Sequence, residues 1–314
     1  MKVAPLDRAK FRDPQRTATG ALRASVHLRS LDTLWFNTGT LCNIECRNCY
    51  IESSPSNDRL AYLKAAEVER FLDEIASGGW PTREIGFTGG EPFVNPEIVP
   101  MLSAALERGF EVLVLTNAMR PVMRPEIREG LLAVRDKYAD RLTLRVSLDH
   151  HTRANHERER GADSWASTLR GLHWFVEHGF RMCVAGRTCW SESEEAMRAG
   201  YQQLFDREKI AIDAFDPHAL VLFPEMDERI DVPEITVDCW GLLNKSPDDV
   251  MCASSRMVVR RQGAAEPVVL SCTLIAYDPQ FELGPTLAAA DREVRLNHPH
   301  CAKFCVLGGA SCSV

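Results

Sequence analysis

The chain has 314 residues, 45% of them hydrophobic and 26% charged, with a net charge of −7. This length allows one large domain, or one large and one small. The acidic balance gives no reason to expect a nucleic acid or an anionic membrane as partner. The first residues contain no apolar core of signal-peptide length, and no later stretch is long and apolar enough to span a bilayer. We therefore expect a cytoplasmic protein with no membrane partner.

Eleven cysteines need an explanation, because a reducing compartment disfavours structural disulfides. Their number is odd, and they gather at 42–49 and again between 239 and 312. This distribution favours metal ligation.

From about residue 33 the sequence alternates β-forming and amphipathic segments. Strands are expected at 34–39, 84–88, 111–115, 142–148, 181–186 and 218–223. Helices are expected at 65–76, from 95 or 96 through 106, at 125–138, 165–176 and 192–205. Six β–α units call for a parallel sheet with right-handed crossovers, which can form a barrel or a doubly wound sheet, and periodicity alone does not decide between them. As a barrel, six units fit an open one better than a closed eightfold one. The predicted fold class is α/β, a partial (β/α)6 barrel.

The pattern changes near residue 230. Two β-forming runs, 257–261 and 267–275, predict a hairpin in a small C-terminal α+β domain. The predicted organisation is an N-terminal lead over 1–32, the barrel over 33–230 and the small domain over 231–314. The lead is locally basic, and we expect it to be a solvated arm.

Three cysteines follow the first predicted strand: Cys42, Cys46 and Cys49. Their spacing lets a short loop wrap one face of a compact metal centre, and thiolates suit iron–sulfur clusters or zinc. Three ligands leave one iron of a four-iron cluster open. On spacing alone, a zinc site with a fourth ligand elsewhere, or buried cysteines, remain alternatives.

A second motif, Gly89-Gly90-Glu91, follows the next predicted strand. Two glycines let the backbone approach a ligand closely, and the adjacent carboxylate can accept hydrogen bonds from an ammonium group. Alone, the motif also fits an ordinary strand-to-helix turn.

Together these motifs resemble the radical S-adenosylmethionine superfamily, whose signature is C-x3-C-x2-C after the first barrel strand. The resemblance implies that Cys42, Cys46 and Cys49 each ligate one iron of a [4Fe–4S] cluster, whose fourth iron binds S-adenosylmethionine. It also implies that Gly89, Gly90 and Glu91 hold the amino group of that cofactor. The family often has an aromatic residue before the third cysteine. Here Asn48 stands there, and Tyr50, placed with the cofactor-binding residues, follows the cysteine.

Three more strand ends carry residues that resemble family positions. Asn117 lies in a Thr-Asn-Ala that resembles the family's Thr-Asn-Gly, and Ser147 begins a Ser-Leu-Asp. By resemblance, Ser147 contacts the cofactor, and Arg187 reaches its carboxylate. Barrels place their chemistry at these carboxyl ends. Polar residues after the fourth strand, Asp149 and Arg160 among them, are expected to line the barrel mouth or to form a solvated loop.

The C-terminal cysteines resemble the cluster-binding extensions called twitch and SPASM domains. The resemblance implies an auxiliary [4Fe–4S] cluster, with one cysteine more than it needs; Cys301 is the first we would leave out. A structural zinc site is the alternative, and His298 or His300 could also ligate. The candidate ligands are Cys252, Cys272, Cys301, Cys305 and Cys312.

The predicted function is that of a radical enzyme. It cleaves S-adenosylmethionine reductively, and the 5′-deoxyadenosyl radical abstracts hydrogen from a substrate. Only about thirty residues precede the first strand, too few for a winged-helix peptide-recognition domain, so we expect a small polar substrate rather than a peptide. The electron donor is expected to be a flavodoxin or a ferredoxin. Alternatives are a peptide-modifying maturase and, in another class, a non-catalytic iron–sulfur electron carrier or redox sensor.

Overall fold

The computed structural model describes residues 4–312, which form one large sheet, a small one and seven α-helices. The large sheet has nine strands in the order β10-β9-β8-β2-β3-β4-β5-β6-β7. Its first six strands along the chain are β2 (Thr33–Asn37), β3 (Glu84–Thr88), β4 (Glu111–Thr116), β5 (Leu142–Ser147), β6 (Arg181–Arg187) and β7 (Leu220–Phe223). The remaining strands are β1 (Ser25–Val26), β8 (Ser255–Val259), β9 (Val268–Leu270), β10 (Glu282–Gly284) and β11 (Val294–Arg295).

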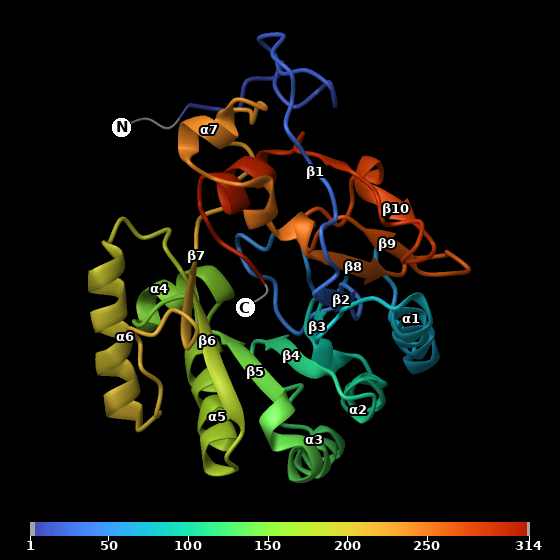
Figure 1. The fold of residues 1–314 in the computed structure, drawn as a ribbon. Coiled ribbons are helices and arrows are strands. Elements are labelled where there is room, and N and C mark those ends of the chain that lie inside the picture. The colour runs from blue at the N-terminus through green and yellow to red at the C-terminus, as the bar shows by residue number, and fades with distance from the viewer. Residues whose placement is uncertain (1–3, 313–314) are drawn as a thin grey trace.

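The six strands β2 to β7 are parallel, each paired with the next along the chain. Helices lie on the outside of this curved sheet, and the strands therefore carry nearly continuous apolar runs (Figure 1). The helices are α1 (Ala65–Gly78), α2 (Ile98–Glu107), α3 (Pro125–Tyr138), α4 (Arg153–Arg160), α5 (Ser164–Glu177), α6 (Glu194–Glu208) and α7 (Cys239–Leu243). This arrangement confirms the predicted α/β class with a partial (β/α)6 barrel.

Helix α4 is an element that the sequence analysis missed. Its sequence, RANHERER, has no apolar stripe, so periodicity offered no signal for it. Only two of its residues, His156 and Glu159, are buried. Both act through polar or aromatic contacts rather than through an apolar face, since Glu159 binds Arg187 and His156 packs edge-on against Trp165.

The predicted C-terminal hairpin is present as the antiparallel pair β8 and β9. In addition, β8 pairs in parallel with β2, so the hairpin extends the barrel sheet at its open edge. The tail contains a short helix, Cys301–Val306. A boundary near residue 230 stays a prediction, because the two parts share one sheet.

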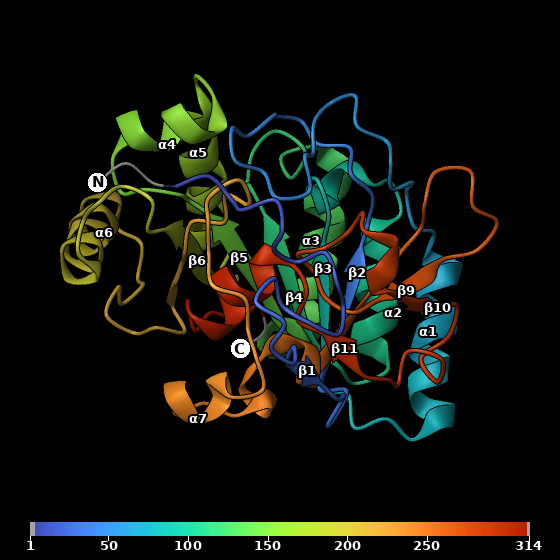
Figure 2. The same cartoon turned by 90° about the horizontal axis from the view of Figure 1, so that it is seen from above.

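The N-terminal segment is not the solvated arm we expected. Strand β1 pairs with β11, and the two lie side by side in Figure 2. The Arg23 side chain is fully buried and forms a 2.5 Å ion pair with Glu234. Residues of the lead therefore pack against the C-terminal part of the chain.

Candidate functional site

The three N-terminal cysteines lie on the loop that leaves β2. The base of this loop is closed where the amide N–H of Cys42 donates to the carbonyl of Ser54, at 3.0 Å. Within the loop, the N–H of Cys49 donates to the carbonyl of Cys46, at 3.3 Å. The short turn thus directs Cys42, Cys46 and Cys49 to one cavity of about 170 Å³.

This cavity lies at the carboxyl ends of the parallel strands; β3 to β7 contribute residues to its lining, and β2 contributes through the loop that follows it. Of the ten residues that the sequence assigned to the cluster and cofactor, nine line it. They are Cys42, Cys46, Cys49, Tyr50, Gly89, Gly90, Asn117, Ser147 and Arg187. Their individual roles stay predictions, but the fold brings them together as the motif order required.

Gly89 and Gly90 are needed for a reason that the sequence did not supply. A Cβ at Gly90 would lie 2.2 Å from the carbonyl oxygen of Leu41, and one at Gly89 would lie 2.6 Å from that of Gly39. Gly89 also has a φ of +145°, which disfavours other residues. The two glycines therefore let the end of β3 pack directly against the base of the cysteine loop.

Glu91 is the one predicted cofactor residue that does not line the cavity. Its carboxylate accepts hydrogen bonds from Thr116 Oγ1 and from the backbone N–H of Asn117, both at 2.8 Å. Burial raises the pKa of Glu91 to about 7, although these hydrogen bonds act in the opposite direction and lower it. Glu91 thus ties the end of β3 to the end of β4, and its contact with a cofactor ammonium stays a prediction.

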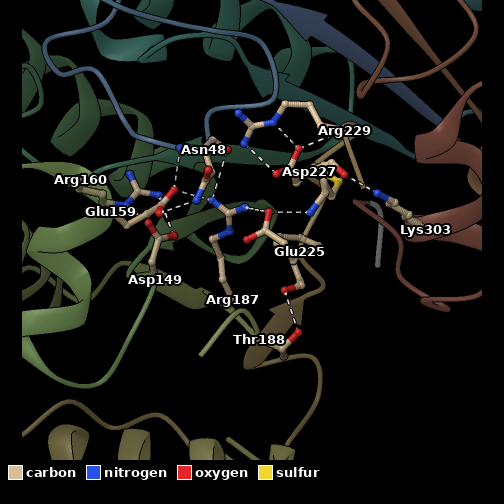
Figure 3. A network of polar contacts seen from close by, with 12 residues as sticks. Asn48, Asp149, Glu159, Arg160, Arg187, Thr188, Glu225, Asp227, Arg229 and Lys303 are labelled. Carbon is tan, nitrogen blue, oxygen red and sulfur yellow. Dashed lines mark hydrogen bonds and ion pairs between the residues drawn. The ribbon is translucent and has the colours of Figure 1, made fainter. Parts of the chain in front are cut away.

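A network of polar contacts lies beside the cavity, and Asn48 and Arg187 of this network line it (Figure 3). Arg187 Nη1 lies 2.7 Å from the carboxylate of Glu159, and its Nη2 lies 3.1 Å from that of Glu225. Asn48, inside the cysteine loop, donates to Glu159 from its backbone at 2.9 Å and from its side chain at 3.0 Å. Arg187 is therefore already neutralised by the protein, and it anchors the cysteine loop through Glu159.

A second pair in Figure 3 joins Asp149 to Arg160 through two hydrogen bonds, of 2.7 and 3.1 Å. Burial alone would raise the pKa of Asp149, but the Arg160 guanidinium holds it below its ordinary value. Both residues line the cavity. The sequence analysis named Asp149 and Arg160 as candidates for the barrel mouth. It gave no sign that Arg160 lies on helix α4, which brings its guanidinium to the Asp149 carboxylate.

The chemistry of the donor set fits an iron–sulfur cluster. Burial raises the pKa of Cys42 to about 12 and that of Cys46 to about 11, so these thiols stay protonated unless a metal displaces the protons. The hydroxyl of Ser53, only 4% exposed, lines the cavity and has no hydrogen-bond partner among the described residues. An unpaired buried hydroxyl destabilises the folded protein. A group in the cavity that forms a hydrogen bond with Ser53 would remove this penalty.

Two other groups of side chains in residues 4–312 come close enough together to bind a single metal ion. In each group, three possible ligand atoms lie within 4.8 Å of one another, and neither group contains a cysteine. The groups are His150–His151–Glu192 and Glu228–His298–His300.

A second cavity collects four of the five C-terminal cysteines. Cys252 comes from the short turn Met251–Ala253, Cys272 follows β9, and Cys301 and Cys305 lie on the helix Cys301–Val306. Cys312 lines the first cavity instead. The cavity lining thus groups Cys301 with three other cysteines and separates Cys312 from them, while the identity of the ligands stays a prediction.

The comparisons with known proteins agree with this site. A family model described as the radical SAM superfamily matches residues 36–199. The subtilosin biosynthesis protein AlbA of Bacillus subtilis is 32% identical over 46% of this chain and 30% of its own, and the mycofactocin maturase MftC of Mycobacterium ulcerans is 28% identical over 44% and 35%. The chain thus spans about a third of each of these relatives. Streptococcus suis SuiB bound to precursor peptide SuiA superposes with a TM-score of 0.62 at 15% identity, over 85% of this chain and 66% of that one.

These relatives overturn one prediction. We expected a small molecule rather than a peptide, because few residues precede the first strand. AlbA is a bacteriocin biosynthesis protein, MftC is a maturase, and SuiB is solved with a precursor peptide. The preference for a small molecule is therefore wrong.

None of the helices in residues 4–312 is both long and apolar enough to cross a membrane.

Proposed function

The chain belongs to the radical S-adenosylmethionine superfamily, and from that premise we propose that it modifies a peptide with the help of an auxiliary [4Fe–4S] cluster. The observation that carries the radical chemistry is the cavity at the strand ends, into which one short loop directs three thiols. When bound there, the cluster supplies the electron that cleaves S-adenosylmethionine and yields the 5′-deoxyadenosyl radical.

The protein's own part is to hold ligands and to exclude competing hydrogen donors. Cys42, Cys46 and Cys49 hold three irons, and the glycine turn after β3 sets the position of their loop. Part of the cavity lining is apolar and includes Phe223, Leu274 and Phe304. An apolar wall keeps water away from a reactive radical.

The auxiliary cluster is assigned to Cys252, Cys272, Cys301 and Cys305, as in a twitch- or SPASM-like domain. All four face one cavity, and burial raises the pKa of Cys252 to about 11 and that of Cys272 to about 12. Four thiolates saturate a four-iron cluster, which favours electron transfer over substrate binding.

The two cavities adjoin each other. Leu274 lines both of them. Met251, which lines the second cavity, accepts a hydrogen bond at its Sδ from the backbone N–H of Cys312, which lines the first. An auxiliary cluster at this place would be close enough to take an electron from a substrate radical.

The radical chemistry is tested by anaerobic reconstitution followed by dithionite and S-adenosylmethionine. We expect 5′-deoxyadenosine by liquid chromatography and mass spectrometry. A Cys46→Ala variant should make none, whereas the matched Cys239→Ala variant, at a cysteine outside both cavities, should match the wild type. A wild type with full iron content and no 5′-deoxyadenosine would sink the proposal.

The substrate class is tested by following hydrogen transfer. An extract of deuterium-grown cells is separated into a peptide fraction and a small-metabolite fraction, and each is offered to the reconstituted protein. We expect deuterium to appear in 5′-deoxyadenosine with the peptide fraction. Deuterium transfer from the small-metabolite fraction alone would contradict a peptide substrate.

A further inference from the structure

Two buried polar groups in the second cavity lack partners. Ser271 is fully buried and His300 is 4% exposed, and both line the cavity with the four cysteines. Ser271 Oγ and His300 Nδ1 have no hydrogen-bond partner among the described residues. Leaving a buried polar group unpaired destabilises the folded protein, so two such groups at one cavity call for a hydrogen-bond acceptor inside it.

The neighbouring histidine does not compete for this role. His298 Nδ1 accepts the backbone N–H of His300 at 3.1 Å, so its ring proton sits on Nε2, which lies 3.5 Å from the carboxylate of Glu228. That arrangement leaves His298 Nε2 without a lone pair for a metal. Glu228 and His298 thus form one contact at ion-pair distance, and the Nδ1 of the neighbouring His300 has no hydrogen-bond partner among the described residues.

We propose that Ser271 Oγ–H and His300 Nδ1–H donate hydrogen bonds to sulfur atoms of the auxiliary cluster and raise its reduction potential. The inference rests on the proposed function, because it requires that cluster. Four cysteines already supply the ligands, so His300 acts as a donor and not as a ligand. Hydrogen bonds to cluster sulfurs stabilise the more negative, reduced state.

The surroundings strengthen this effect. The rest of the lining is mostly apolar, including Val250, Ile275 and Phe281. Electrostatic interactions are stronger in such a medium than in water. The two donors would therefore set how readily the auxiliary cluster accepts an electron.

The test uses the full chain with Cys42, Cys46 and Cys49 changed to Ala, so that only the auxiliary cluster gives a signal. Its midpoint potential is measured by redox titration followed by electron paramagnetic resonance. Ser271→Ala and His300→Leu should each lower the potential, and the double variant should lower it further. Ser271→Thr and His300→Gln keep a donor and should restore part of the shift.

Two results would overturn the inference, and a third would overturn the proposed function. An unchanged potential in both Ser271→Ala and His300→Leu, with iron retained, would show that neither group donates. Loss of iron in His300→Leu, with Ser271→Ala unshifted, would make His300 a ligand. Absence of any auxiliary cluster in the parent variant would instead contradict the proposed function. If His300→Leu fails to fold, the nearly isosteric Ser271→Ala still decides the role of the serine.

Discussion

The two cysteine sites are built in opposite ways. The first takes three thiols from residues 42–49, a single loop, and faces a cavity ringed by strand ends. The second takes four thiols from three segments that are some twenty to thirty residues apart, and the fold alone brings them together. A site held in one loop can be recognised from spacing, whereas a site assembled by the fold can be delimited only once the fold is known.

The difference in thiol number has a chemical meaning. Three thiolates leave one iron of a four-iron cluster open to an outside ligand, and four leave none. We therefore expect one reactive cluster and one electron-transfer cluster within the same chain. Four changes would break or sharpen this contrast.

The largest effect is expected from removing the three-thiol site. Changing Cys42, Cys46 and Cys49 to Ala should abolish 5′-deoxyadenosine formation and reduce iron from about eight to about four atoms per chain, because only the four-thiol cluster remains. Iron assay and product analysis check both numbers. Iron near zero would contradict an auxiliary cluster held by the other four cysteines.

The second change separates Cys305 from Cys312. Cys305→Ala removes a thiol of the second cavity and should lower iron toward about four atoms per chain. Cys312→Ala, the matched control, should leave about eight, since Cys312 lines the other cavity. The reverse result, with iron lost in Cys312→Ala only, would contradict the ligand assignment.

The third change concerns the glycine turn that supports the cysteine loop. In Gly90→Ala the new Cβ would overlap the Leu41 carbonyl, so the free energy of unfolding should fall by about 4 kcal/mol or more, as for severe backbone clashes. Gly241 has open space around it, and Gly241→Ala should not destabilise the protein. Chemical denaturation of both variants measures this, and equal stabilities would refute the packing role of Gly90.

The fourth change tests the ion network beside the first site. Arg187→Ala leaves the buried Glu159 without its cation and should cost about 3 kcal/mol in the free energy of unfolding. Arg229 also pairs with a carboxylate, that of Asp227, but is 81% exposed. Arg229→Ala should therefore change nothing measurable in the same denaturation experiment. Similar losses in both variants would show that burial does not decide the strength of these pairs.

Much of the fold could be predicted because its parallel strands are apolar and its helices amphipathic. The range of α3 was predicted to the residue, and the buried positions Val68, Phe71, Leu72 and Ile75 of α1 follow the expected helical spacing. Helix α4 was missed because it is polar on every face. The N-terminal segment was misread because its buried Arg23 looks like a surface residue until Glu234, over two hundred residues away, is placed beside it.

The candidate site shows the same limit. Spacing was enough to group Cys42, Cys46 and Cys49, but no spacing shows that Cys312 lines a different cavity from the other four C-terminal cysteines. The two hydrogen-bonding roles of Glu91 depend on its contact with β4, a neighbouring strand. The role of Glu159 depends on a helix that the sequence did not indicate. Contacts between distant segments carry no local signal.

The central claim is that the chain holds one open and one closed cluster. The most direct test is Mössbauer spectroscopy of the ⁵⁷Fe-reconstituted protein, with and without S-adenosylmethionine. We predict that the cofactor perturbs one iron site in the wild type and none in the variant with Cys42, Cys46 and Cys49 changed to Ala. A cofactor-dependent change in the cluster of that variant would show that the four-thiol site is the open one, and would contradict the account.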